Sequence, residues 1–150
     1  SNNESLIRTW SSQYLAIAHA NQVLDALGKM EMTDKLRAAK GEALICRAYA
    51  HFVLVNIFCQ QYDPNYPDDM GIPYMEKAET ELDPKYERGT VAEVYAKIEK
   101  DIEEGLPLID DAIYSVPKYH FNRKRLIPSP HGSSCIIRNG TKPRNMPRKR

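Results

Sequence analysis

The chain has 150 residues, of which 42% are hydrophobic and 27% are charged, and its formal net charge is +1. This length is typical of one domain, and the hydrophobic content is sufficient for a buried core. Cys46, Cys59 and Cys135 are odd in number and have no CxxC spacing, so they indicate neither a disulfide framework nor a zinc site. No stretch approaches the roughly 18 apolar residues of a membrane span, and the first ten residues do not resemble a secretory signal.

The first predicted element is a helix from about Ser5 to Leu27. Its apolar residues recur at steps of three and four and therefore share one face, which consists of Leu6, Trp10, Tyr14, Ile17, Leu24 and Leu27. We expect Asn3 or Ser5 to cap its N-terminus and Gly28 to end it in the left-handed conformation. Asn21 lies in the same stripe, and we favour a buried amide bonded to neighbouring backbone over a ligand contact.

A second helix is predicted to begin near Thr33 and Asp34 and to end at about Gln60. Its apolar residues form two faces, one with Leu36, Ala43, Cys46, Ala50, Val53 and Ile57, the other with Leu44, Ala48, Phe52, Val55 and Cys59. A helix that is apolar on two sides is expected to lie between neighbours. Arg47 and His51 interrupt the pattern. One hypothesis is that they form a functional pair. We favour the other, in which they are structural and the buried arginine forms an ion pair with a carboxylate from an adjacent helix.

The next segment, DPNYPDDMGIPYMEKAETELDPKYERG, is rich in proline, glycine and carboxylates and is therefore predicted to be a loop. A short extended piece is possible at residues Gly71 to Tyr74. Four side chains in it are oxygen ligands of the type that calcium prefers, namely Asp63, Asn65, Asp68 and Asp69. Pro64 and Pro67 break any EF-hand spacing, so we favour a solvated acidic loop and expect no metal.

The third predicted helix opens with a capping box, in which Thr90 is the N-cap and Glu93 lies three residues later. Its apolar stripe consists of Val91, Val94, Tyr95, Ile98, Ile102, Leu106 and Ile109. Asp101, Glu103 and Glu104 are expected to form a solvated face, because their spacing gives no indication of a paired acid and base.

Three long helices joined by loops, without a strand pattern, predict an all-α fold built from helical hairpins. The sequence contains no glycine-rich phosphate loop, no paired metal ligands and no Ser, His and Asp set. We therefore expect no catalytic residue, no metal, no cofactor and no enzymatic activity. A free-standing helical-repeat module that binds another protein is one functional hypothesis, although such arrays usually need about three repeats or more.

Three segments together resemble the SusD/RagB family of outer-membrane nutrient-binding lipoproteins. They are WSSQYLAIAHANQVLDAL, then KGEALICRAYAHFVLVNIF followed by GIPY, and TVAEVYAKIEKDIEEGLPLI leading to YHFNRK. The resemblance implies that they are the first tetratricopeptide-like helices of a much larger α-rich protein, of which this chain is an internal fragment. The scaffold positions that we expect are Trp10, Tyr14, Asn21, Arg47, Tyr49 and Phe52, together with Thr90 and Glu93 of the capping box. No ligand-binding residue can be transferred from the family to this chain.

The role implied by this resemblance is binding without catalysis. Family members bind oligosaccharides or other nutrients at the surface of the outer membrane and pass them to a SusC-like TonB-dependent transporter, so we expect these partners for the full-length protein. Family members also begin with a lipoprotein signal and an acylated cysteine, neither of which opens this sequence. We interpret the exposed loop aromatics Tyr62, Tyr66 and Tyr74 as loop anchors rather than sugar-stacking platforms.

Residues 125–150 differ in composition from the rest of the chain. They hold seven Lys or Arg and no Asp or Glu, whereas residues 1–124 hold 14 basic and 20 acidic residues. Such an asymmetry suggests an arm that binds nucleic acid or a membrane. The tail contains no aromatic residue on which a base could stack, and we expect no nucleic-acid partner.

We interpret the tail instead as a sequence that is out of frame from near Lys124. In the family, the FNRK stretch leads into a helix rich in Ala, Tyr and Phe and then into a helix with a Trp-Asp-Lys-Ala-like opening. One permitted codon set for residues 125–149, read one nucleotide out of frame, encodes AAYSFAARFFLYYTEWDKAAEYAEK, which has both features. We therefore expect a partial helical scaffold over residues 1–124 and a disordered basic tail over residues 125–150.

Overall fold

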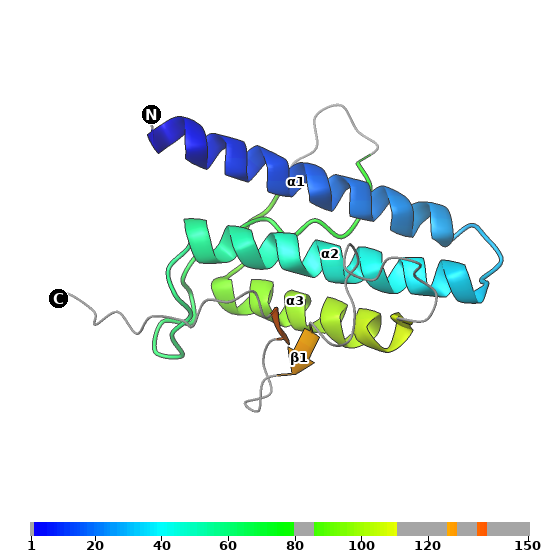
Figure 1. Cartoon of the computed structure of the whole chain (residues 1–150). Helices are drawn as coiled ribbons and strands as arrows, with labels where there is room; N and C mark the ends of the chain where they lie inside the picture. The colour runs from blue at the N-terminus through cyan, green and yellow to red at the C-terminus, as the bar shows by residue number, and fades with distance from the viewer. Residues whose placement is uncertain (1, 80–85, 111–125, 129–134, 138–150) are drawn as a thin grey trace.

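The computed structural model describes residues 2–79, 86–110, 126–128 and 135–137. Its helices are α1 (Asn2–Leu27), α2 (Asp34–Phe58) and α3 (Val91–Gly105), and a short 3-10 helix, η1 (Leu106–Leu108), follows α3. Helix α2 lies between α1 and α3 and packs against both, and α1 and α2 form an antiparallel hairpin (Figure 1). The predicted all-α fold of helical hairpins is confirmed, as is the position of the second helix between two neighbours.

The first helix begins earlier than the sequence predicts. Helix α1 starts at Asn2, so neither Asn3 nor Ser5 is its N-cap, and that prediction is wrong. Glu4 lies in the first turn, where its negative charge interacts favourably with the positive end of the helix dipole. This interaction supports the helix start without a side-chain cap at the predicted positions.

The predicted end of α1 at Leu27 is confirmed, but Gly28 does not adopt the left-handed conformation. The backbone forms a tighter turn at the end of α1 instead. The Gly28 N–H donates to the Leu24 carbonyl at 3.0 Å, and the Lys29 N–H donates to the Ala26 carbonyl, three residues back, at 3.1 Å. Bonds of this 3-10 type satisfy the last carbonyls of a helix, so no left-handed residue is needed.

The other two helices begin at threonine caps. The Thr33 hydroxyl accepts a bond from the Leu36 N–H at 3.3 Å at the start of α2, which ends at Phe58, two residues earlier than predicted. In α3 the Thr90 hydroxyl accepts from the Glu93 N–H at 3.2 Å, while the Glu93 carboxylate accepts from the Thr90 N–H at 2.7 Å. The predicted capping box is therefore confirmed.

The main hydrophobic core lies between the three helices and includes one loop residue, Ile72. Its buried members are Ile17, Ala48, Ala50, Leu54, Val55, Ile72, Val91, Val94 and Ile98. They include residues from both predicted faces of α2. Phe52 and Ile57, however, are 36% and 47% exposed, so the two apolar faces of α2 are covered only in part.

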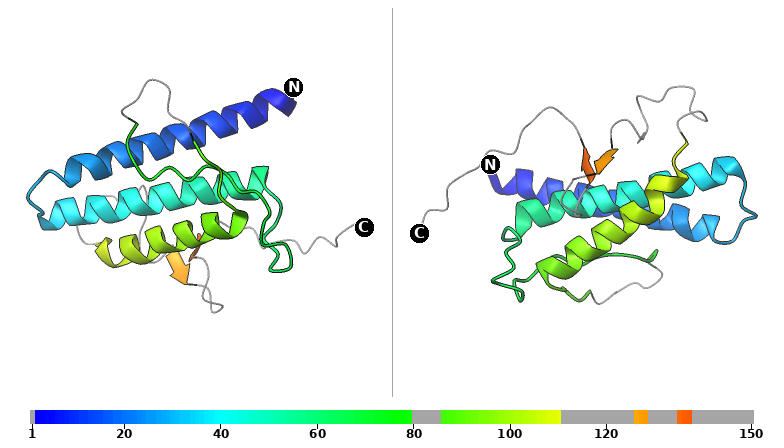
Figure 2. Two further views of the ribbon diagram at one scale, coloured as in Figure 1. Left: turned by 180° about the vertical axis from the view of Figure 1, so that it is seen from behind. Right: turned by 90° about the horizontal axis from the view of Figure 1, so that it is seen from below.

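Residues 60–79 follow α2 without forming a helix or a paired strand, apart from one isolated β-bridge between Met70 and Thr90. Beside this bridge the Gly71 N–H donates to the Gly89 carbonyl at 2.8 Å. The extended piece predicted at Gly71 to Tyr74 begins directly after it. Figure 2 shows this loop crossing one face of the helical layer.

Six described residues of the tail form a two-stranded antiparallel pair. Strand β1 (Leu126–Pro128) pairs with β2 (Cys135–Ile137), and Ile127 lies opposite Ile136. This strand pair was not predicted, because the sequence showed no strand pattern and the tail was expected to be disordered. The remaining tail residues, and the frame change proposed near Lys124, lie outside the described residues.

Helix α2 is the one helix in the described part of the chain that is long and apolar enough to cross a membrane, by length and composition only. No membrane-spanning segment was predicted from the sequence. Of the 18-residue stretch of α2 that meets this criterion, 56% is buried inside the protein. A core helix passes the same test, and the position of α2 between α1 and α3 accounts for its apolar composition.

Helices α2 and α3 meet at two glycines that face each other. A Cβ atom on Gly41 would lie 2.8 Å from the Gly105 carbonyl oxygen, and a Cβ atom on Gly105 would lie 2.9 Å from the Gly41 carbonyl oxygen. In both cases the opposing atom belongs to the backbone, which cannot rotate away as a flexible side chain can. The close approach of these helices therefore depends on glycine at both positions.

We predict that Gly105→Ala lowers the free energy of unfolding by about 1 to 3 kcal/mol through overpacking, which exceeds the helix propensity that alanine gains. The matched control is Gly28→Ala, because a Cβ atom there would contact the carbonyl oxygens of Leu24 and Asp25 at an ordinary 3.5 Å. Urea unfolding followed by circular dichroism measures both variants. A Gly105→Ala variant as stable as the wild type would contradict the close-approach explanation.

Candidate functional site

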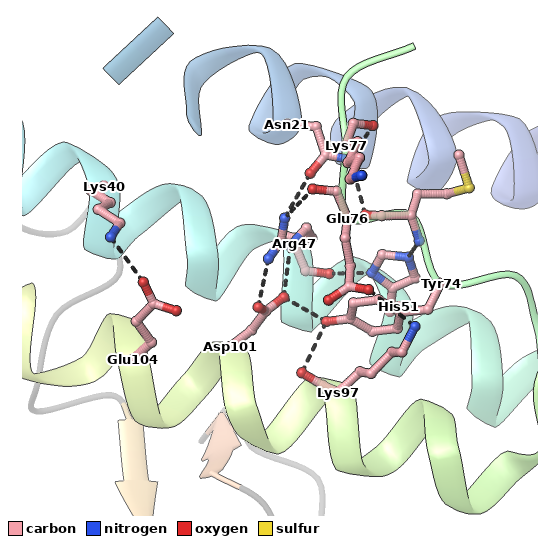
Figure 3. Close-up of polar contacts among 11 residues, drawn as sticks. Asn21, Lys40, Arg47, His51, Tyr74, Glu76, Lys77, Lys97, Asp101 and Glu104 are labelled. Atoms are coloured by element: carbon pink, nitrogen blue, oxygen red, sulfur yellow. Dashed lines mark hydrogen bonds and ion pairs between the residues drawn. The ribbon is translucent and has the colours of Figure 1, made fainter. Parts of the chain in front are cut away.

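A buried ion pair connects α2 and α3. Arg47 donates from Nε to Asp101 Oδ2 at 2.7 Å and from Nη2 to Asp101 Oδ1 at 2.6 Å, in a bidentate arrangement (Figure 3). Both side chains are buried. The prediction that Arg47 is a structural residue paired with a carboxylate from an adjacent helix is confirmed.

The same ion pair corrects the interpretation of the acidic residues on α3. Asp101 is 3% exposed and is not part of a solvated face, whereas Glu103 and Glu104 are exposed as predicted. The sequence did contain a signal, because Asp101 follows Val94 and Ile98 at helical spacing and therefore lies on the apolar stripe of α3. A carboxylate on that stripe opposite a buried arginine is its electrostatic partner.

Asn21 extends this network to α1. Its side-chain oxygen accepts a bond from Arg47 Nη1 at 2.9 Å, and its Nδ2 donates to the carbonyl oxygens of Met75 at 2.9 Å and Lys77 at 3.2 Å (Figure 3). The prediction of a buried amide bonded to backbone is confirmed. Arg47 Nη1 also donates to the Glu76 carbonyl at 3.0 Å, so residues 75–77 are held from two helices.

His51 fixes the same loop from α2. Its Nε2 accepts a bond from the Met75 N–H at 3.0 Å, so the ring is neutral with its proton on Nδ1, which donates to the Arg47 carbonyl at 2.8 Å. The ring stacks on Tyr74 with centroids 3.7 Å apart and planes 15° apart. Burial, and then the charge of Arg47, lower the pKa of His51 to about 4.

Tyr74 completes the network. Its hydroxyl donates to Asp101 Oδ2 at 2.6 Å and lies 3.3 Å from the Lys97 carbonyl, while the Lys97 ammonium group is 5.7 Å from the ring centroid. Burial and the neighbouring Asp101 carboxylate raise the pKa of Tyr74. The loop-anchor prediction is confirmed for Tyr74. Tyr62 and Tyr66 are more exposed, and the Tyr62 ring has its centroid 6.1 Å from that of Tyr95 on α3.

The other predicted scaffold residues do not all lie together in the structure. The Trp10 ring lies with its centroid 4.9 Å from those of Tyr14 and Phe58, and the Tyr14 hydroxyl donates to the Pro73 carbonyl at 2.8 Å. Tyr49 and Phe52 are exposed on α2, away from this network. The scaffold role expected of these two residues stays a prediction.

A cavity of about 260 Å³ lies beside the network, between α1 and residues 73–79. Its walls are mostly apolar and aromatic, and they include Trp10, Tyr14, Ile17, Pro73, Met75 and Tyr86. Asn21, Lys77 and Glu79 add polar atoms to the lining. Of these residues, Trp10, Tyr14 and Asn21 were predicted from the sequence as scaffold positions. Lys77, Glu79 and Tyr86 belong to no periodic pattern and were not predicted to line a site.

In the described part of the chain, no three His, Cys, Asp or Glu side chains converge on one point. Asp63 instead accepts bonds from the Asn65 backbone N–H at 3.0 Å and from the Asn65 side chain at 2.9 Å. This local pattern at Asp63 and Asn65 is an Asx turn.

We predict that Asp101→Ala lowers the free energy of unfolding by about 3 to 5 kcal/mol, because Arg47 then remains buried and unpaired. The matched control is Glu104→Ala. Glu104 also bridges the same two helices, through Lys40 at 2.9 Å, but in solvent, so its loss should cost about 1 kcal/mol or less. Urea unfolding of both variants gives the comparison, and equal losses would contradict the structural importance of the buried pair.

We predict a pH-dependent stability from His51. Its pKa is about 4 in the folded state and 6.5 in the unfolded state, so the unfolded state binds the proton more readily. Stability is therefore complete above pH 6.5 and falls by about 3 kcal/mol as the pH drops toward 4. His51→Gln should reduce this slope, whereas His19→Gln, at an exposed histidine, should not. Identical slopes for all three proteins, measured by urea unfolding between pH 4 and 7, would contradict the assignment.

A family profile described as starch-binding and associating with the outer membrane matches residues 1–126, which contain all three helices. No protein of curated function matches the chain closely enough to count as a relative. The family found by this comparison is the one that the three sequence segments resembled.

Several solved structures are similar to this chain. A proposed sugar-binding protein from Bacteroides vulgatus is 30% identical over 68% of the chain, with a TM-score of 0.63. A SusD-like carbohydrate-binding protein from the same species is also 30% identical, over 72% of the chain, with a TM-score of 0.58. A SusD superfamily protein from Bacteroides thetaiotaomicron is 24% identical over 68% of the chain, with a TM-score of 0.62, and shows the same fold.

This chain spans only about a quarter of those three solved proteins, which it covers over 24%, 23% and 23% of their lengths. Within that part, the helical hairpin and the third helix correspond to the segments from which the resemblance was inferred. The match over residues 1–126 shows that the chain belongs to the SusD-like family, which is described as starch-binding and associating with the outer membrane.

Proposed function

We propose that the full-length protein binds an oligosaccharide or another nutrient at the cell surface and passes it to a SusC-like TonB-dependent transporter. The observation that supports this proposal is the family match over residues 1–126. The 30% identity to a SusD-like carbohydrate-binding protein of known structure gives further support. In this proposal the present chain contributes the helical scaffold, and the surface of the outer membrane is its location.

The chemistry of the buried groups supports binding without catalysis. Both ring nitrogens of His51 are occupied, one by the Arg47 carbonyl and the other by the Met75 N–H. Both carboxylate oxygens of Asp101 are bonded to Arg47, and one of them is also bonded to Tyr74. A general base must reach the proton that it removes, and neither group is accessible to a substrate in this arrangement.

A helical-repeat module that binds another protein is the second candidate. It is supported by the exposed apolar side chains of α2, which include Tyr49, Phe52 and Ile57. Exposed apolar patches of this kind often mark contacts with further helices or with a partner protein. The two candidates differ in one respect that can be measured, because only the first requires an oligosaccharide or another nutrient as its ligand.

We predict that the purified full-length protein binds soluble starch or another polysaccharide of a glycan panel without releasing reducing sugar. Calorimetry and a reducing-sugar assay measure the two properties, with bovine albumin as the negative control. Affinity capture from outer membranes should recover a TonB-dependent transporter. A folded full-length protein that binds no glycan would contradict the carbohydrate-binding form of the proposal, and release of sugar would contradict the non-catalytic role.

A further inference from the structure

The cavity between α1 and residues 73–79 has the size of a small ligand. Its volume of about 260 Å³ lies just below the range of roughly 300 to 1,000 Å³ that is typical of sites for drug-sized molecules. One six-membered ring with its substituents fits such a volume, and a chain of several rings does not. The occupant suited to this cavity is therefore a single ring or the terminal ring of a longer molecule.

The walls of the cavity combine two kinds of surface. Aromatic faces come from Trp10 and Tyr14 on α1 and from Tyr86 across the cavity, and Trp10 and Tyr86 are 37% and 44% exposed. Charged groups come from Lys77 and Glu79, and Glu79 also accepts a bond from the Tyr86 hydroxyl. A pyranose ring has the matching chemistry, because its C–H faces are apolar and its hydroxyl groups both donate and accept hydrogen bonds.

The wall formed by residues 73–77 is rigid before any ligand arrives. Asn21 holds the carbonyls of Met75 and Lys77, and His51 holds the Met75 N–H (Figure 3). Tyr14, which itself lines the cavity, donates a hydrogen bond from its hydroxyl to the Pro73 carbonyl. A wall fixed by partly buried hydrogen bonds loses little conformational entropy when a ligand binds, which favours binding of a small molecule.

A purely structural explanation accounts for only part of this arrangement. The need to satisfy the non-helical backbone explains the bonds to residues 73–77. It does not involve Trp10 and Tyr86, which are 37% and 44% exposed at the cavity, where a ligand can reach both rings. The combination of a fixed wall and accessible aromatic rings is typical of a binding site.

From these observations we infer that this cavity is a binding subsite for a single pyranose ring, which stacks on Trp10 and Tyr86 and bonds to Lys77 and Glu79. The inference rests on the proposed carbohydrate-binding function and adds to it a specific location on the scaffold. The expected dissociation constant for a free monosaccharide is on the order of 1 to 10 mM, because so small a ligand forms few contacts.

Trp10 makes the site directly observable, because it is the only tryptophan in the 150-residue chain. We expect free glucose, galactose, mannose or xylose, each titrated alone, to change its fluorescence in a saturable manner. Tyr86→Ala should weaken that binding by roughly fivefold to tenfold, since it removes one stacking face. The matched control is Tyr66→Ala, because Tyr66 is 63% exposed and does not line the cavity, and it should leave the titration unchanged.

Glu79→Gln is a second variant at an exposed side chain, which should weaken binding while far-UV circular dichroism shows an unchanged helix content. The absence of a saturable response in the helical wild-type chain would overturn the inference. A response that is equally strong in the wild type, Tyr86→Ala and Glu79→Gln would also overturn it. If the isolated chain lacks helical structure in solution, the full-length protein decides the question.

Calorimetry on the full-length protein separates this inference from the proposed function. If the wild type binds a glycan and Tyr86→Ala binds it roughly fivefold more weakly, the subsite is supported. If both proteins bind the glycan equally, the carbohydrate-binding function stands and the subsite is rejected. If the full-length protein binds no glycan, the carbohydrate-binding form of the proposed function fails, whereas a monosaccharide response at Trp10 of the isolated chain would still support the cavity as a sugar site.

Discussion

The structure depends on one requirement, that the buried charge of Arg47 be neutralised and its remaining N–H groups be bonded. An unpaired guanidinium in a protein interior costs several kcal/mol, so the fold must bring partners to it from elsewhere in the chain. Asp101 comes from α3, Asn21 from α1, and the Glu76 carbonyl from the intervening loop. The ion pair alone is not strong evidence for stability, but its geometric demands specify how three helices and a loop are arranged.

Several of these residues also form hydrogen bonds to the backbone of residues 73–77. A segment that is neither helix nor sheet has no partners within itself for its N–H and carbonyl groups. Tyr14, Asn21, Arg47 and His51 supply these partners, and Tyr74 in turn bonds to Asp101. Because the loop is held in this way, the cavity beside α1 has a fixed wall. Scaffold and candidate subsite are therefore parts of one hydrogen-bonded arrangement.

Much of this fold could be predicted from local patterns. Apolar residues at helical spacing predicted three helices, and Thr90 with Glu93 predicted a capping box, because helix periodicity and capping depend on residues only a few positions apart. Arg47 and Asn21 were recognised as buried polar residues because they interrupt apolar stripes. The start of α1 and the conformation of Gly28 were predicted wrongly, since helix ends can be satisfied in more than one way and neighbouring residues alone do not select among them.

The sequence by itself determined that this chain is helical, that α2 lies between two neighbours and that Arg47 requires a carboxylate. It did not determine which carboxylate, because pairing over 54 positions depends on how the helices pack, and the position of Asp101 on the apolar stripe of α3 does not by itself identify its partner. The tertiary structure also decided that Gly41 and Gly105 face each other and that Trp10, Lys77 and Tyr86 meet around one cavity. Contacts between residues far apart in the chain carry no periodic signal, so only the folded arrangement reveals them.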